Sequence, residues 1–268
     1  MHLLAISDDH VVLRSAILLC LVAIPVALIL LALDRRVLDD EFIWLKPIKF
    51  HLSLAVHAAT VLLAARLLPE VWQTHMVTKA GLTLFGAVVI YEAAFLSIQA
   101  GRGVRSHFND TSTFDAIGGT IMAAGAGVLV VIPLLIGAAL VIATWRGGWA
   151  EASKNPLRLA VALGFILTGW LAAQTGSAIG ANAGPFVGVD TSSGRFMPLT
   201  GWALEGGDYR ISHFLGVHAM QAVSLVVLIL LLIFPPAVVA ALTVPVAAGW
   251  AALTLHAFAH AADGLPPL

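Results

Sequence analysis

The chain has 268 residues, of which 60% are hydrophobic and 11% are charged, and its mean hydropathy is +0.96. Since an ordinary globular domain carries about 25% charged residues, this composition predicts an integral membrane protein. The net charge of -1 and the lack of a basic run exclude a nucleic-acid partner. The one cysteine, Cys20, excludes internal disulfides, CxxC redox motifs and thiolate zinc sites.

Seven apolar stretches are long enough to cross a bilayer, which takes about 20 residues. They predict an all-α fold, an integral membrane bundle of seven transmembrane helices, as a single domain over residues 1–268. We interpret the first stretch as a retained span, because it is longer than the core of a signal peptide and no cleavage site precedes Asp34. The fourth contains Gly118, Gly119 and Pro133, so we expect it to tilt or kink. The predicted spans are 11–33, 48–68, 77–100, 114–145, 156–180, 211–234 and 236–261.

Seven spans put the two termini on opposite sides of the membrane. The loops around 34–47, 101–113 and 181–210 then share one side with the C-terminus, which we call the site face. The site face carries eight Lys and Arg residues and the other face six, so the positive-inside rule leaves the orientation open. We expect the bacterial inner membrane as the location.

Almost every ionisable or amide side chain within the spans falls near the site face. At 1.5 Å per residue, four of them lie roughly 8–13 Å below it. These four are His57, Glu92, His218 and His256. Because burying such groups in hydrocarbon costs several kcal/mol each, we expect them to serve a function. The full set is His51, His57, Glu92, Gln99, Gln174, His213, His218, His256 and His260.

Histidines that face each other across a bundle suit axial ligation of a heme iron. The leading hypothesis is therefore a heme b-binding membrane oxidoreductase or electron carrier with a lipid-soluble partner such as quinone. His57 and His218 are the expected axial ligands, with His256 as the substitute for either. The heme propionates would pair with cations at the interface. Those cations are Lys49, Arg102, Arg105 and Arg210. Protons or substrate hydrogen bonds would fall to Glu92, Gln99 and Gln174.

Two other functions stay open. One is a metal-dependent membrane enzyme that acts on a lipid, with zinc, iron or copper held by histidine and carboxylate. Its ligands would come from His51, His57, His213, His218, His256 and His260, with Glu92 or Asp115 to complete the shell. The other is a transporter or binding protein for an anionic small molecule, in which arginines hold the ligand and histidines relay protons. Broken helices near Gly118 and Gly180 would fit that function.

Two pairs of short similar runs within the chain raise the hypothesis of a duplication, although such matches arise easily in a chain rich in Ala, Leu, Val and Gly. The run Ser53–Ala58 (SLAVHA) is similar to Phe214–Ala219 (FLGVHA), and Ile98–Gly101 (IQAG) is similar to Ala173–Gly176 (AQTG).

The stretch from Gln174 to His218 resembles part of the heme A synthase family. In that family a Q…G motif ends one span, an extramembrane loop follows, and the next span opens with a heme-ligating histidine. The resemblance implies that His213 or His218 is an axial ligand. The chain lacks the loop cysteines of many members and the family's HExxxR run. A second likeness is to seven-span zinc hydrolases of the ceramidase and adiponectin-receptor type. It is carried by Ser53-x3-His57 and His256-x3-His260, which stand at the opposite helix ends from those of that family.

Overall fold

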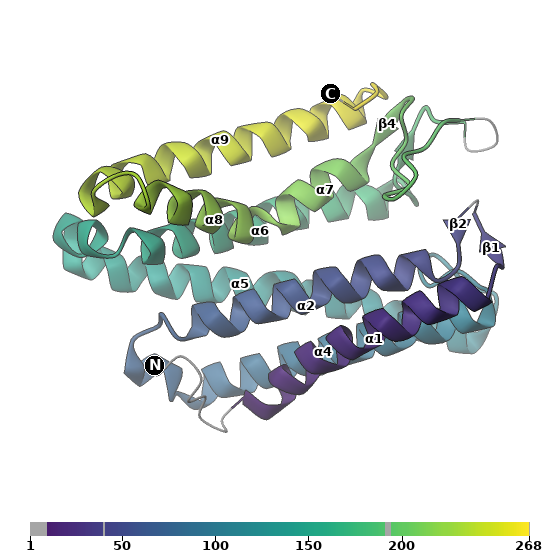
Figure 1. Cartoon of the computed structure of the whole chain (residues 1–268), viewed down its shortest axis with the longest axis horizontal. Coiled ribbons are helices and arrows are strands. Elements are labelled where there is room, and N and C mark those ends of the chain that lie inside the picture. Colours follow the sequence, from purple (N-terminus) through teal and green to yellow (C-terminus); the bar gives the residue numbers. More distant parts are fainter. Residues whose placement is uncertain (1–9, 40, 191–193, 268) are drawn as a thin grey trace. The chain divides into compact units, whose positions relative to one another are not determined.

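The computed structural model describes residues 10–39, 41–190 and 194–267 (Figure 1). Within these residues the fold is all-helical, as predicted, with two short antiparallel ladders in the loops. The helices are α1 (Val11–Leu33), α2 (Leu45–Ala65), α3 (Glu70–Gln73), α4 (Met76–Arg102), α5 (Thr113–Lys154), α6 (Pro156–Ala181), α7 (Tyr209–Val217), α8 (Ala219–Leu231) and α9 (Pro236–Ala262). The strands are β1 (Val37–Leu38), β2 (Glu41–Phe42), β3 (Phe186–Val187) and β4 (Gly207–Asp208).

In the described part of the chain, six helices are long and apolar enough to cross a membrane. They become seven if α7 and α8, which meet at a 56° bend, form one broken span. The chain is therefore that of an integral membrane protein. The helix bounds agree with the predicted spans to within three residues, except that α5 continues nine residues further.

The helix breaks expected near Gly118 and Gly180 are not found, whereas the expected tilt or kink of the fourth span stays a prediction. Helix α5 runs without interruption through Gly118, Gly119 and Pro133, and its non-helical backbone is at Gly148, with φ 61° and ψ −159°. Gly180 lies in the last turn of α6 and breaks nothing. A proline or glycine inside a membrane helix is tolerated where neighbouring helices support the backbone. The predicted single span 211–234 is instead broken at His218.

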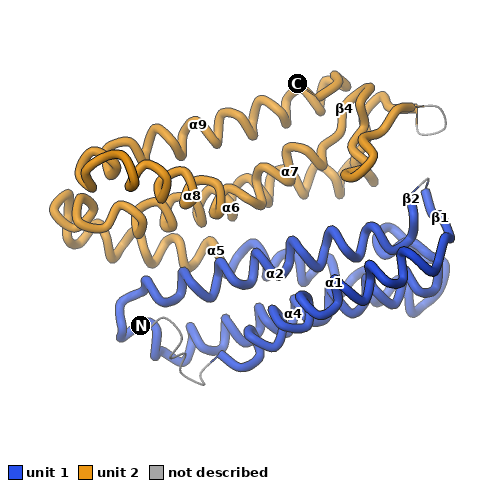
Figure 2. The backbone as a smooth tube through the Cα atoms, viewed as in Figure 1, with its two compact units in different colours: residues 1–132 blue, residues 133–268 orange. Residues whose placement is uncertain are grey.

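Contacts divide the chain into two compact units, residues 1–132 and 133–268 (Figure 2). The prediction of a single domain over 1–268 therefore stays a prediction. In the first unit α1, α2 and α4 pack on one another, joined by α5 up to Ile132. Helices α1 and α4 approach so closely that a Cβ on Gly86 would lie 2.7 Å from the Cα atom of Leu13. Small residues at such crossings are how membrane helices gain packing contacts.

The second unit packs α6, α7, α8 and α9 around one another, with α5 from Pro133 onward against α6. Glycines again mark the closest approaches. A Cβ on Gly164 would lie 2.9 Å from the Met220 Cα atom, and one on Gly216 would lie 3.1 Å from the Leu171 carbonyl carbon. The broken α7–α8 span is thus held tightly against α6 on both sides of its bend.

The two units repeat one order of elements. In the first, α1 leads through the β1–β2 ladder to α2 and then to α4. In the second, α6 leads through the β3–β4 ladder to α7–α8 and then to α9. Helix α2 and the α7–α8 pair hold equal places, so the similarity around His57 and His218 fits this repeat. The similarity around Gln99 and Gln174 does not, because α4 comes third in its unit and α6 comes first.

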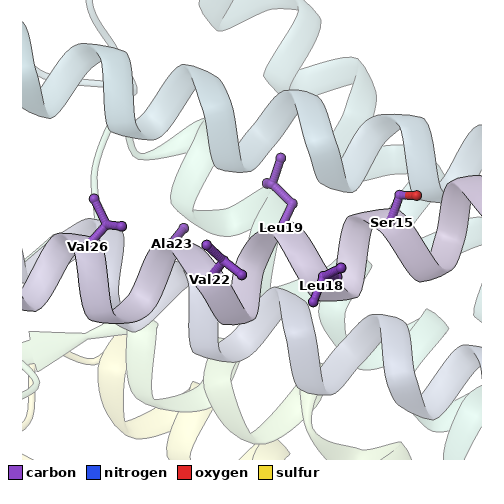
Figure 3. A pocket seen from close by; sticks show the side chains of 6 residues that line it. All are labelled: Ser15, Leu18, Leu19, Val22, Ala23 and Val26. Carbon is purple, nitrogen blue, oxygen red and sulfur yellow. The ribbon is translucent and has the colours of Figure 1, made fainter.

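The outward side of α1 suits contact with lipid. A shallow hollow of about 480 Å³ follows this helix and is lined by side chains of α1 alone (Figure 3). Five of the six are apolar, and the exception is Ser15. In the most apolar 18-residue stretch of α1, only 17% of the residues are buried inside the protein. Such a surface is favourable against acyl chains and costly in water.

Candidate functional site

A line of polar side chains follows the contact between α4 and α5 in the first unit. At its outer end the Asp115 carboxylate, buried in the first turn of α5, pairs with Arg102. The carboxylate also accepts hydrogen bonds from the Gln99 amide at 2.7 Å and from the Ser112 hydroxyl at 2.5 Å. In return the Ser112 hydroxyl accepts from the Asp115 backbone N–H at 3.2 Å, which closes a capping arrangement at the start of α5.

Glu92 lies deeper along the same contact, ten residues before the end of α4 and therefore about 15 Å from it. Its side chain is buried, and its Oε1 atom has no hydrogen-bond partner within the described part of the chain. Helix α5 can approach this carboxyl because the facing residue is Gly125, where a Cβ would lie 2.8 Å from Oε1. An unsatisfied carboxyl oxygen in an apolar interior costs free energy, so it calls for a functional reason.

His57 of α2 faces the next turn of α5. Its Nε2 atom lies 3.1 Å from the Leu129 carbonyl oxygen, four residues beyond Gly125 on α5. Its ring stacks on Phe85 with a centroid distance of 5.5 Å. Residues four apart lie on one helix face about one turn from each other. The structure therefore brings Glu92 and His57 onto the same face of α5.

The tautomers of the buried histidines follow from their partners. A carbonyl oxygen only accepts, so His57 carries its proton on Nε2. The Ser97 hydroxyl already donates to the Ala93 carbonyl at 2.9 Å, so it accepts from Nε2 of His51 at 3.0 Å. The Nδ1 atom of His51 is buried without a partner among the described residues.

In the second unit, His213 and His218 carry their proton on Nδ1, whereas His51 and His57 of the first unit carry it on Nε2. The Thr175 hydroxyl donates to the Leu171 carbonyl at 2.7 Å and therefore accepts from Nδ1 of His213 at 3.0 Å. Nδ1 of His218 donates to the Gln221 amide oxygen at 3.3 Å. In both rings Nε2 is then the basic nitrogen, which is the form that ligates metals.

The break at His218 is held together by a threonine of α6. The Thr168 hydroxyl accepts from the Met220 backbone N–H at 2.9 Å and donates to the Val217 carbonyl at 3.3 Å. These backbone groups flank the break, and a side chain that bonds both lets the bend persist in a membrane. Sequence reasoning missed both threonines, although Thr168 is the one polar residue between Arg158 and Gln174, and Thr175 directly follows Gln174.

The remaining predicted site residues are less enclosed. His256 and His260 of α9 are in edge-to-face contact, with ring centroids 4.5 Å apart. His256 is exposed, whereas Nδ1 of His260 is buried without a partner in the described residues. Gln174 is half-buried on α6. Within the described residues, no three His, Cys, Asp or Glu side chains lie close enough to hold a metal ion. Of the predicted ligands, His51, His57 and Glu92 belong to the first unit, and His213, His218, His256 and His260 belong to the second.

The four cations expected to hold an anion each have a carboxylate partner in their own unit. Besides the Arg102–Asp115 pair, Lys49 lies 2.9 Å from Glu41, Arg105 lies 2.6 Å from Asp39, and Arg210 lies 2.6 Å from Asp208. An external anion would compete with these carboxylates. Their role toward heme propionates or another anion stays a prediction.

His107, in the loop after α4, is a polar group whose role the sequence did not reveal. Its Nδ1 atom lies 3.4 Å from the Lys46 ammonium and 2.9 Å from the Ser106 hydroxyl. Burial, and secondly the Lys46 charge, lower the pKa of His107 to about 3. A proton on this ring would face an ammonium group across a desolvated contact, so the imidazole is neutral.

The buried position of His107 beside Lys46 predicts that the folded protein loses stability in acid. Between pH 6.5 and 3 the unfolded chain binds a proton at His107 and the folded chain does not. The stabilisation is thus fully present above pH 6.5 and declines as the pH falls, by at most about 1.4 kcal/mol per pH unit. The His107→Gln variant should lose this slope in thermal melts between pH 7.5 and 4.5. The control is His75→Asn, which keeps an acceptor for the Val77 N–H at the start of α4. A slope that persists unchanged in His107→Gln would contradict the assignment.

Comparisons with family models, with curated proteins and with solved structures found no match to this chain.

Proposed function

We propose that the protein is a proton-coupled membrane transporter for a small polar molecule, with Glu92 as the group that binds the proton. The observation that carries this proposal is the buried Glu92 carboxyl, whose Oε1 atom has no partner in the described chain. An ionisable group at this depth is costly, and in transporters such groups form proton relays.

The contacts of Glu92 support this role. A carboxyl among apolar groups is favoured in its neutral form while water is excluded, and it releases its proton when water reaches it. The Asp115–Gln99–Arg102 cluster lies on the same α4–α5 contact nearer the loop, and His57 lies one turn deeper. A proton from the site face would meet these groups in that order.

The repeated architecture also supports transport. Many transporters are built from internal repeats, and their substrate sites use discontinuous helices near the middle of the membrane. Here two three-helix units are connected through α5, and the α7–α8 span is broken at His218. Next to the break, Nδ1 of His218 lies 3.3 Å from the Gln221 amide oxygen, which places polar groups inside the span. We also propose the bacterial inner membrane as the location.

Solute-evoked proton movement tests the proposal. Purified protein would be reconstituted in liposomes that contain a pH-sensitive dye, and a panel of amino acids, sugars, nucleosides and short carboxylates would be added outside. We expect one solute class to change the internal pH when the protein is present, and not in protein-free liposomes. No response to any class, from protein that remains folded, would overturn the proposal.

A heme b electron carrier with a quinone partner is the second candidate, favoured by the Nε2 lone pairs of His213 and His218. The fit is partial, because the expected ligand His57 donates from its own Nε2 to Leu129. Bound heme would supply a one-electron centre, and the chain's part would be to hold it through His213 or His218.

Absorption of protein expressed with ample heme tests this candidate. A Soret band that is lost in the His218→Ala variant would establish it, and a colourless preparation would exclude it. Elemental analysis of the same sample tests the metal-dependent lipid enzyme, which requires a stoichiometric metal ion.

A further inference from the structure

The second unit contains a cavity that the transport proposal does not use. Its volume is about 190 Å³, and it lies where α7 begins and α9 ends, near the edge of the membrane. The loop before α7 contributes Met197 and Trp202, and α9 contributes Ala257 and His260. Residues 265–267, which follow α9, close another side.

The loop wall of this cavity is held firmly in place. Backbone bonds join Met197 to Trp202 at 2.8 Å and Gly201 to Met197 at 2.9 Å, which forms a tight hairpin. The buried Asp208 carboxylate accepts from the Ala203 backbone N–H at 2.9 Å, and the Arg210 guanidinium donates to the Gly201 carbonyl. A wall fixed by so many bonds keeps its cavity open in the absence of a ligand.

The side chains that line the cavity determine which kind of ligand it can bind. The lining is almost entirely apolar, and the Asp208 carboxylate that borders it is already occupied by several donors. His260 differs, because its imidazole lines the cavity and no hydrogen bond to either ring nitrogen is found within the described residues. A ring nitrogen that lines the cavity and has no protein partner can bond a ligand oxygen without breaking an existing hydrogen bond within the protein.

The volume limits the size of this ligand. An apolar cavity of about 150 Å³ accepts one benzene ring, whereas drug-sized ligands need about 300 Å³ or more. A space of about 190 Å³ therefore holds one six-membered ring with an oxygen substituent. Its position at the end of two membrane helices would let such a ring enter from the lipid.

We propose that this cavity binds an oxygen-substituted six-membered ring of a lipid-soluble molecule, a phenol or a quinone, through a hydrogen bond to His260. An imidazole ring nitrogen can accept from a hydroxyl group or donate to a carbonyl group, so both ring types share this chemistry. The site is separate from Glu92, which lies in the other unit.

Fluorine NMR of small probes tests the site on the full-length protein in lipid nanodiscs, with empty nanodiscs as the blank. We expect 4-fluorophenol to bind roughly tenfold more tightly than fluorobenzene, as one additional hydrogen bond predicts. Equal binding of the two probes to the wild-type protein would overturn the proposal without the use of any variant.

Variants locate the binding. Ala257→Phe should fill the cavity and abolish binding of both probes, while Ala252→Phe, on an exposed position of the same helix, should leave it unchanged. His260→Leu should reduce 4-fluorophenol binding to the level of fluorobenzene. Wild-type affinity in folded Ala257→Phe protein would show that the probes bind elsewhere. Competition with methyl-1,4-benzoquinone distinguishes the sources, since displacement identifies quinone rings and its failure identifies phenols.

Discussion

Replacing Glu92 with glutamine should remove the transient current that a pH jump evokes in membranes containing the protein. When a carboxyl inside the membrane gains or loses a proton, charge moves through part of the membrane field, and we expect the amide to reduce that charge movement by roughly tenfold. Glutamine has almost the same shape, so the variant should still fold. The current is measured on a supported membrane with adsorbed proteoliposomes and requires no knowledge of the substrate.

Two further variants separate proton binding from structure. Glu92→Asp keeps an ionisable group and should restore part of the current. Glu70→Gln removes an exposed carboxylate outside the spans and should leave the current unchanged. A wild-type current in Glu92→Gln would refute Glu92 as the proton-binding group. A sustained current in place of a transient one would indicate a proton conductor and refute obligatory coupling.

Replacing Gly86 with alanine should separate α1 from α4. The new methyl group would lie 2.7 Å from the Leu13 Cα atom, 2.8 Å from the Leu13 backbone nitrogen and 3.0 Å from the Val12 carbonyl carbon. Backbone atoms cannot turn aside as a side chain can, so one helix must shift. Overpacking of this kind costs about 1–3 kcal/mol. For a chain of this size each kcal/mol corresponds to a change of about 2–4 °C in Tm.

Gly249→Ala is the matched control, because a Cβ there meets nothing within 4 Å. It lies inside α9, where alanine is favoured over glycine in a helix by roughly 0.5–1 kcal/mol. The two variants should therefore move Tm in opposite directions in thermal melts of the purified protein. A Tm for Gly86→Ala equal to or above that of Gly249→Ala would contradict the close contact between α1 and α4.

One part of the site, in the first unit, was predictable from the depth of polar residues along the spans. Glu92 and His57 were expected in one layer, and the structure places both against one face of α5. The partners of these residues were not predictable. The lack of a partner for the Glu92 Oε1 atom, and the opposite tautomers of His57 and His218, depend on which groups of other helices come within hydrogen-bond distance.

The positions of the helix breaks were likewise not predictable from the sequence alone. Gly118 and Pro133 have residue types that favour a break, yet α5 continues through both, while α7–α8 bends at His218, where Thr168 of α6 bonds the backbone on both sides. Contacts with residues distant in the sequence therefore outweighed the local preference of glycine and proline for a helix break.

By itself the sequence determined that this protein crosses a membrane and where its helices run. A helix that crosses the bilayer core needs a long apolar stretch, and a polar residue within such a stretch is easily recognised. Only the tertiary structure decided which charges neutralise one another, which span is broken and which polar atoms stay unpaired. Those properties depend on distances of a few ångström between helices far apart in the chain, and neither composition nor spacing along one helix contains them.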